Sequence, residues 1–316
     1  MHPGTFAIFR VLADGEPRDA AELGVAAGLP ADAFDAACAE LAALGAPLEQ
    51  RAGRIRLAEP VELLEESRIG RLVGDSRVRL EVVPICESTN SLALDRARTG
   101  APSGTTIASE IQTSGRGRRG NRWAAPPGGS IALSMIWRYP AASMPLSGLS
   151  LVAGLACLEA LDGFGVPGAG LKWPNDLVAK GRKLGGILVE VAGTAAVVGV
   201  GINLRVPSAV TAGLAQPVID LAALGRPPGR NALAASVADA LARALAAFEA
   251  LGFAAFREAW AARHALQGER VRVLPAGGAP VEGRAVGVAE DGALLVETAR
   301  GVERFVSAEV SVRAAA

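Results

Sequence analysis

A short stretch of the sequence concentrates residues that bind anions. It runs from Thr113 to Trp123 and holds three glycines and four arginines. Arginine carries a permanent charge and five N–H donors, and glycine lets the backbone approach a ligand closely. The stretch predicts a flexible loop that holds a phosphate or carboxylate, with Trp123 as a platform for a flat ring such as adenine. This loop alone leaves open a solvated basic turn or an arginine-glycine segment that binds nucleic acid.

Two later stretches add a lysine and further polar groups. Residues 172–176 read Lys-Trp-Pro-Asn-Asp, which predicts a strand that ends in a turn, because proline cannot donate to a strand ladder. Lys183 lies after this turn and before an apolar strand that begins at Gly186. A lysine beside a hairpin is ordinarily a solvated surface charge. In combination with the arginine loop, Lys183 becomes the leading catalytic candidate.

These stretches, in this order and at this spacing, resemble the biotin protein ligase family, in its bifunctional bacterial form with an N-terminal winged-helix domain. The resemblance rests on residues 113–123, 172–176 and 182–190. Glu-Ser-Thr-Asn at 87–90 and Gly-Val-Gly-Ile-Asn at 199–203 extend it. It covers the catalytic and C-terminal regions well and the N-terminal region only in outline.

The resemblance assigns roles to individual residues. It implies that Lys183 lies between the biotin carboxylate and the α-phosphorus of ATP, and that Arg118 holds the adenylate phosphate and closes the loop. The implied biotin-binding set is Ser88, Thr89, Asn90, Gln112, Gly115, Arg116, Gly117, Arg118, Lys183 and Gly186. The implied set for ATP or the adenylate is Arg116, Arg118, Arg119, Trp123, Asn175, Lys183 and Asn203. Lys172 and Asp176 support these sets, and Asp176 either binds Mg²⁺ or orients Lys183.

The implied reaction suits the residue types present. ATP converts the biotin carboxylate to biotinyl-5'-AMP, and a lysine of a biotin carboxyl carrier protein or domain, from acetyl-CoA carboxylase or a related carboxylase, then receives the biotin. Activation of this kind depends on positioning and positive charge rather than on a protein nucleophile. The sequence has only two histidines, His2 and His264, and suggests no nucleophile paired with a histidine. ATP and biotin are expected as substrates, and Mg²⁺ is expected with the triphosphate.

Composition narrows the class of protein. The chain has 316 residues, a formal net charge of +0 and three cysteines that lie far apart. The balanced charge does not predict attraction of the whole chain to nucleic acid or to a membrane. Dispersed cysteines of odd number argue against a disulfide framework. We therefore expect a soluble cytoplasmic protein with no membrane partner, and a homodimer remains open.

The first 62 residues predict a winged helix. Helical segments are expected at 6–12, 19–24 and 31–44, followed by a two-stranded hairpin that turns at Ala52-Gly53. DNA recognition by such a domain needs basic side chains on the recognition helix. The expected recognition helix has three acidic residues and no basic one, and residues 1–60 carry a net charge of −4. Specific DNA binding is therefore not expected, and the arginines of the hairpin are the remaining candidates for phosphate contacts.

The rest of the chain predicts two further domains. Residues 66–266 contain apolar strands at 78–83, 105–112, 129–137 and 195–203, and a helix at 149–161. Residues 231–262 are expected to be helical, as one helix or as two that are separated at Gly252. By resemblance they form a mixed-sheet ligase domain similar to class II synthetase-like folds. Residues 267–316 hold short strands separated by glycine turns, which is typical of a small SH3-like β-barrel. The predicted fold class is α+β.

Three other functions compete with this interpretation. A biotin-sensing repressor would need the basic recognition helix that is missing here. A lipoate or octanoate ligase should lack the glycine-arginine loop and the polar residues that suit a ureido ring. An RNA-binding protein is disfavoured by the neutral net charge and by aromatic residues that do not alternate with basic ones.

Overall fold

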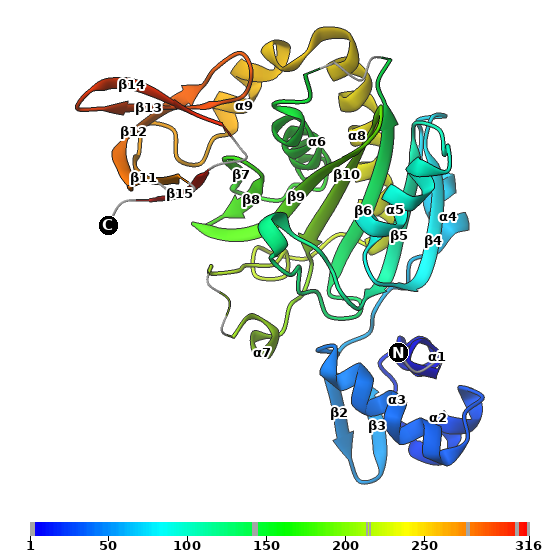
Figure 1. The fold of residues 1–316 in the computed structure, drawn as a ribbon. Helices are drawn as coiled ribbons and strands as arrows, with labels where there is room; N and C mark the ends of the chain where they lie inside the picture. The colour runs from blue at the N-terminus through cyan, green and yellow to red at the C-terminus, as the bar shows by residue number, and fades with distance from the viewer. Residues whose placement is uncertain are drawn as a thin grey trace.

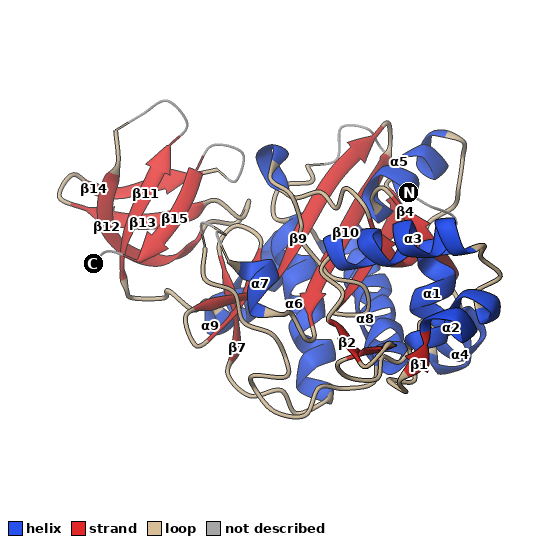
Figure 2. Cartoon of the chain, turned by 90° about the horizontal axis from the view of Figure 1, so that it is seen from below, coloured by secondary structure: helices blue, strands red, loops and turns tan. Residues whose placement is uncertain are grey.

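The computed structural model describes residues 4–140, 145–212, 214, 216–275, 279–306 and 310–314. Figure 1 shows three groups of elements in chain order: a small blue N-terminal group, a large body coloured from cyan to yellow, and an orange-red sheet near the C-terminus. Figure 2 shows that the N-terminal helices and the C-terminal sheet lie at opposite ends of the body.

The N-terminal group combines three helices with a small sheet. Its sheet has the strand order β1-β3-β2 and is antiparallel. The helices pack on this sheet through buried apolar side chains that include Phe9, Leu41 and Leu57. The helices and the hairpin lie where the sequence predicts them, and both turn residues, Ala52 and Gly53, have positive φ. The elements are α1 (Gly4–Leu12), β1 (Arg18–Asp19), α2 (Ala20–Ala26), α3 (Ala31–Ala43), β2 (Leu48–Arg51) and β3 (Arg54–Leu57).

A seven-stranded sheet with the order β4-β5-β6-β10-β9-β8-β7 forms the centre of the molecule. Only β4 and β5 pair in parallel among the described pairs, so the sheet is mixed, as predicted. The strands in sheet order are β4 (Arg79–Cys86), β5 (Thr105–Gln112), β6 (Ser130–Arg138), β10 (Ala195–Asn203), β9 (Arg182–Ala192), β8 (Asp176–Ala179) and β7 (Ala169–Lys172).

Helices cover the two faces of this sheet unequally. Successive side chains of a strand point to opposite faces. On β6, Leu133 and Met135 join the large core formed with α6 (Leu149–Gly163) and α8 (Arg230–Leu251), whereas Ile136 packs with α5 (Thr89–Arg98). The short α4 (Glu66–Leu72) packs on α8. The large core is thus on one face, and the other face, beside α5, is left for a site.

Helix α8 is long and apolar enough, by composition, to cross a membrane. In this fold 67% of its apolar window is buried, against α6 and the sheet, so it serves as a core helix. It ends at Leu251, and Gly252 adopts a φ of 66°. Two short helices follow, η2 (Phe253–Phe256) and α9 (Arg257–Arg263), which agrees with the predicted break near Gly252.

The C-terminal group is a five-stranded antiparallel sheet with the order β14-β13-β12-β11-β15. Its buried residues, such as Val271 and Val296, belong to the same core as the central domain. Nε1 of Trp173 donates to the carbonyl oxygen of Gly292 at 3.0 Å, which ties the two groups together. The strands are β11 (Arg270–Pro275), β12 (Val281–Val288), β13 (Leu294–Thr298), β14 (Gly301–Phe305) and β15 (Val310–Ala314), and β15 was not predicted.

Candidate functional site

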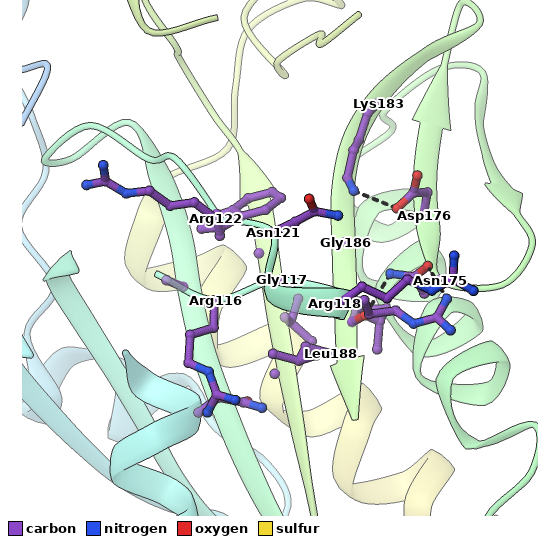
Figure 3. Close-up of a pocket in the computed structure, with 18 of the residues that line it drawn as sticks. Arg116, Gly117, Arg118, Asn121, Arg122, Asn175, Asp176, Lys183, Gly186 and Leu188 are labelled. Atoms are coloured by element: carbon purple, nitrogen blue, oxygen red, sulfur yellow. Dashed lines mark hydrogen bonds and ion pairs between the residues drawn. The ribbon is translucent and has the colours of Figure 1, made fainter. Parts of the chain in front are cut away.

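A cavity of about 420 Å³ lies where the loop 113–123 faces strands β8 and β9 (Figure 3). Its walls come from the start of α5, the end of β5, the arginine loop, the hairpins of β7 to β9, and the middle of β6 and β10. Segments far apart in the sequence therefore converge on one face of the central sheet, the face that α5 covers only in part.

Small residues form the floor of this cavity. Ser134 and Ala132 on β6 pair with Gly199 and Gly201 on β10. A Cβ atom on Gly199 would lie 2.2 Å from Oδ1 of Asn90, and one on Gly201 would lie 2.5 Å from the Trp123 ring. Both distances are far shorter than atoms tolerate, so the two glycines leave room for the asparagine and the tryptophan.

Polar side chains gather at the α5 end of the cavity. The backbone N–H of Thr89 donates to Oε1 of Gln112 at 2.8 Å. Oγ of Ser134 lies 2.8 Å from both Oγ1 of Thr89 and Oδ1 of Asn90. Ser88 precedes α5 but makes no side-chain capping bond to the helix. Its hydroxyl is therefore not used in the way that a helix cap would use it.

The arginine loop is held in a narrow hairpin. The N–H of Trp123 donates to the carbonyl of Gly115 at 2.8 Å, and the N–H of Gly117 donates to that of Asn121 at 2.7 Å. Arg119 adopts a φ of 56° inside a single 3-10 turn, η1 (Arg118–Gly120). A Cβ on Gly115 would lie 2.6 Å from the carbonyl oxygen of Trp123, so this position requires glycine.

Arg118 points from the loop toward strands β8 and β9 (Figure 3). Its Nη1 donates to Oδ1 of Asn175 at 3.1 Å, and Nδ2 of Asn175 donates to the carbonyl of Ile187 at 3.0 Å. Burial lowers the pKa of Arg118 below its ordinary value, and Arg119 adds to this effect while Asp176 opposes it. An arginine still keeps its charge, so Arg118 places a poorly solvated cation inside the cavity.

Lys183 forms a second cationic centre. Its Nζ lies 2.7 Å from Oδ1 of Asp176, with side chains 23% and 13% exposed (Figure 3). Nε2 of Gln216 donates to the other oxygen of Asp176 at 3.2 Å. The Lys183 ammonium also lies 6.0 Å from the centre of the Trp123 ring. The lysine is therefore held in one place by a carboxylate that is itself fixed.

Most of the residues predicted for the site line this one cavity. They are Ser88, Thr89, Asn90, Gln112, Arg116, Gly117, Arg118, Arg119, Trp123, Lys172, Asn175, Asp176, Lys183 and Gly186. Gly115 and Asn203 are not among the lining residues. Nδ2 of Asn203 instead donates to the carbonyl of Ile219 at 3.2 Å, and so braces the loop that follows β10.

The sequence motifs did not include two polar side chains that line the cavity, those of Ser134 and Gln216. The sequence does contain a clue to Ser134. It shares one face of its strand with the small residue Ala132, whereas the other face is apolar, and a lone hydroxyl on a buried strand needs a partner. The sequence contains no such clue to Gln216, because this residue lies in an irregular segment and reaches Asp176 only through the fold.

Metal clusters and histidine chemistry are not features of the described cavity. Within the described ranges, no group of three or more His, Cys, Asp or Glu side chains could hold a metal ion. His264 lies against Trp260, with ring centres 4.5 Å apart, and is not a lining residue. Burial lowers its pKa to about 4, an effect that Gln267 partly offsets. The cavity suits the binding of an anion and a polar ring instead.

Comparison with known proteins identifies the family. The Biotin/lipoate A/B protein ligase family matches residues 82–206, and the biotin protein ligase C-terminal domain matches residues 267–313. The chain is 34% identical to the bifunctional ligase/repressor BirA of Escherichia coli over 315 residues, which span 98% of this chain and 97% of that protein. It is 37% identical over 252 residues to the biotin–[acetyl-CoA-carboxylase] ligase of Mycobacterium tuberculosis, covering 77% of this chain and 92% of that one.

Solved structures agree. The biotin protein ligase from Aquifex aeolicus in complex with biotin and ATP superposes with a TM-score of 0.66 and 27% identity, and the match covers 75% of this chain and 99% of that chain. The family models, the relatives and the solved structure agree, and they confirm the resemblance to biotin protein ligases. This chain belongs to the biotin protein ligase family and is an enzyme of the ligase class.

Proposed function

We propose that this chain activates biotin with ATP to biotinyl-5'-AMP and then transfers the biotin to a lysine of a biotin carboxyl carrier protein. The observation that carries the proposal is the cavity, which has polar groups at its α5 end and two held cations, Lys183 and Arg118, at the other. A ligand with a polar ring at one end and a carboxylate at the other matches these two ends of the cavity.

The biotin ring would lie at the polar end. A ureido group has two N–H donors and one carbonyl acceptor, so it needs hydroxyl and amide partners. Ser88, Thr89, Asn90 and Gln112 supply these, and Ser134 belongs with them because of its contacts to Thr89 and Asn90. The small floor residues leave space for the ring above the sheet.

The nucleotide would lie on the side of the arginine loop. Trp123 offers its ring to adenine, and Arg118, Arg119 and Asn175 offer donors to the phosphates. The guanidinium of Arg116 bonds Glu190 and Ser91 and so holds the loop in place. A carboxylate oxygen of biotin attacks the α-phosphorus, the bond to the bridging oxygen breaks, and pyrophosphate leaves. Lys183 stabilises the negative charge that gathers on the α-phosphate, and Arg118 holds the resulting adenylate under the loop.

Mg²⁺ is expected to arrive with the triphosphate, bound mainly by phosphate oxygens. Among the described residues that line the cavity, Asp176 is the only carboxylate. Its two oxygens already contact Lys183 and Gln216, which favours the role of orienting Lys183 over that of a metal ligand.

The acceptor would be the carrier domain of acetyl-CoA carboxylase or a related carboxylase. The M. tuberculosis relative is named for that substrate, and this supports the proposal. The acceptor lysine, as a neutral amine, attacks the carbonyl carbon of the adenylate, and AMP leaves. The test is incubation of the chain with biotin, ATP, Mg²⁺ and a purified carrier domain. A single biotinyl mass increase on one lysine supports the proposal, and an unmodified carrier domain contradicts it.

The N-terminal 62 residues are proposed to be a winged helix that does not bind a specific DNA site. Helix α3 has no basic residue, and Arg56 of the hairpin pairs with Glu49 at 2.6 Å. Arg51 and Arg54 of the hairpin are exposed. The E. coli relative is named a repressor, so a gel-shift assay on the DNA upstream of the biotin genes is informative. Tight binding at physiological salt would contradict this proposal.

We further propose the domain limits 1–62, 66–266 and 267–316. In this scheme the central domain resembles class II synthetase-like folds and the last domain is an SH3-like barrel, which the five-stranded antiparallel sheet supports. We also propose a cytoplasmic location, which cell fractionation tests, and a homodimeric assembly, which sedimentation of the purified chain tests.

A further inference from the structure

A chain of side-chain contacts runs from the end of β5 to the arginine loop. It begins at Gln112, passes to Thr89 and Ser134, and then reaches Asn90. The chain closes through one residue on β9, Glu190, which the sequence analysis did not place in the site. Oε2 of Glu190 accepts a hydrogen bond from Nδ2 of Asn90 at 2.9 Å, and Oε1 accepts one from Nη2 of Arg116 at 2.7 Å.

Glu190 reaches this position by strand alternation. Gly186 and Leu188 line the cavity from the same face of β9, so residue 190 continues that row beyond the cavity edge. Its side chain is 25% exposed, whereas that of its partner Arg116 is 44% exposed. The carboxylate is therefore open to water on one side and joined to the buried side chain of Asn90 on the other.

The two hydrogen bonds have different consequences. The bond from Asn90 fixes its amide, so Nδ2 points to Glu190 and Oδ1 points to Ser134. An amide that rotated by half a turn would place its oxygen against the carboxylate, which is repulsive. The bond from Arg116 ties the loop to the sheet, and Nη1 of Arg116 also donates to Oγ of Ser91 at 3.3 Å on α5.

An ordinary ion pair at this exposure contributes little to stability, because water screens the two charges. Stability alone therefore gives no reason for the arrangement. The shared carboxylate does have a geometric effect, because one side chain both orients Asn90 and anchors the loop that covers the nucleotide side.

We propose that Glu190 is a positioning residue that couples closure of the loop 113–123 to the orientation of Asn90 at the biotin end of the cavity. This inference rests on the proposed function. Closing the loop brings Arg116 to Glu190, which strengthens the hold on Asn90, and a bound biotin that orders Asn90 strengthens the hold on the loop. Biotin binding and adenylate retention are linked through one carboxylate.

The test compares three variants of the full chain. Glu190→Gln keeps the shape of the side chain but has one acceptor oxygen instead of two, so it cannot accept from both partners. Arg116→Gln removes the loop anchor and leaves Asn90 bonded to Glu190. Glu159→Gln is the matched control, because Glu159 pairs with Arg243 at the same distance of 2.7 Å on an exposed surface away from the cavity.

Two quantities are measured: the KM for biotin in ATP–pyrophosphate exchange, and the rate at which preformed biotinyl-5'-AMP leaves the protein. Glu190→Gln should raise the biotin KM and the release rate each by about tenfold, the scale of a hydrogen bond to a charged group. Arg116→Gln should raise the release rate by a similar factor and the biotin KM by much less. Glu159→Gln should change neither.

The possible outcomes distinguish a failure of the proposed function from a failure of the proposed coupling. If the unsubstituted chain shows no biotin-dependent exchange, the proposed function fails, and this inference with it. If exchange is normal but Glu190→Gln stays within twofold of Glu159→Gln in both quantities, the coupling alone is overturned. A Glu190→Gln variant that fails to fold leaves Arg116→Gln as the test, and unchanged adenylate release in that variant overturns the coupling as well.

Discussion

The ammonium of Lys183 and the carboxylate of Asp176 form a 2.7 Å ion pair at the edge of the cavity, and Gln216 fixes the same carboxylate from the other side. A lysine on a flexible stem loses rotamer freedom when it is held, and Asp176 holds it before any ligand arrives. The arrangement places a fixed positive charge where a nucleotide phosphate would lie, beside Trp123.

Lys183→Ala should lower the rate of ATP–pyrophosphate exchange by about 100-fold or more, because it removes charge stabilisation in the transition state. The thermal midpoint should change little, because the side chain is partly exposed and its partner Asp176 can be solvated. Lys180→Asn is the matched control: it removes a nearby exposed lysine at a φ of 49°, a conformation that asparagine tolerates. Exchange within twofold of the control would remove Lys183 from the mechanism.

Substitutions of Gly199 and Gly201, the two glycines on the floor of the cavity, should affect different substrates. Gly199→Ala places a Cβ against Asn90 and should raise the KM for biotin, whereas Gly201→Ala places one against Trp123 and should raise the KM for ATP. Neither glycine has a positive φ, so the effect comes from crowding rather than backbone strain. Overpacking of this size costs about 1–3 kcal/mol, which corresponds to about 5-fold to 150-fold in KM. Equal effects of both variants on both substrates would contradict the assignment.

The buried pair of Arg230 and Glu110 should matter for stability rather than chemistry. The side chains are 5% and 2% exposed, with Nη1 and Oε2 2.8 Å apart, and Arg230 also donates to the carbonyls of Glu62 and Ser130. Glu110→Gln leaves a buried cation without its countercharge and should lower the free energy of unfolding by about 3–5 kcal/mol. Urea unfolding measures this, with Glu159→Gln as the surface control. A loss below about 1 kcal/mol would be inconsistent with a buried pair.

Acid should destabilise the protein through His264. Its pKa is near 4 in the folded protein because burial disfavours the charged ring, whereas the unfolded chain titrates near its ordinary value. Between those values the unfolded chain binds the additional proton, so stability is full above about pH 6.5 and falls as the pH drops toward 4. His264→Gln should flatten the curve of thermal midpoint against pH in that window. A slope unchanged by the substitution would mean that His264 does not titrate there.

Much of the fold follows from local pattern. The apolar strands, the Gly252 break after α8 and the hairpin turn at Ala52-Gly53 were all readable from the sequence. Strand β15 was not predicted, although Val310 and Val312 alternate with polar residues, because so short a segment does not reveal that it pairs with β11. Local periodicity cannot report such a long-range pairing.

The residues of the candidate site also fall into those that the sequence could predict and those that it could not. Residues within contiguous motifs, such as Arg118 and Lys183, could be named because glycine, arginine and lysine at that spacing carry chemical meaning. Ser134 lies outside those motifs, and Glu190 ends the motif 182–190 without a pattern that shows what it contacts. Only the register between β6, β9 and β10 brings both to α5. Asn203 lay in a motif but braces a loop instead of lining the cavity, because its amide points to the carbonyl of Ile219.

The most direct test of the central claim is ATP–pyrophosphate exchange by the purified chain, with biotin, with lipoate and with no added acid. We expect exchange that depends on biotin and is absent with lipoate, because the polar side chains at the α5 end of the cavity match a ureido ring and lipoate has no group to bond them. Exchange driven by lipoate, or no exchange with either acid, would contradict it.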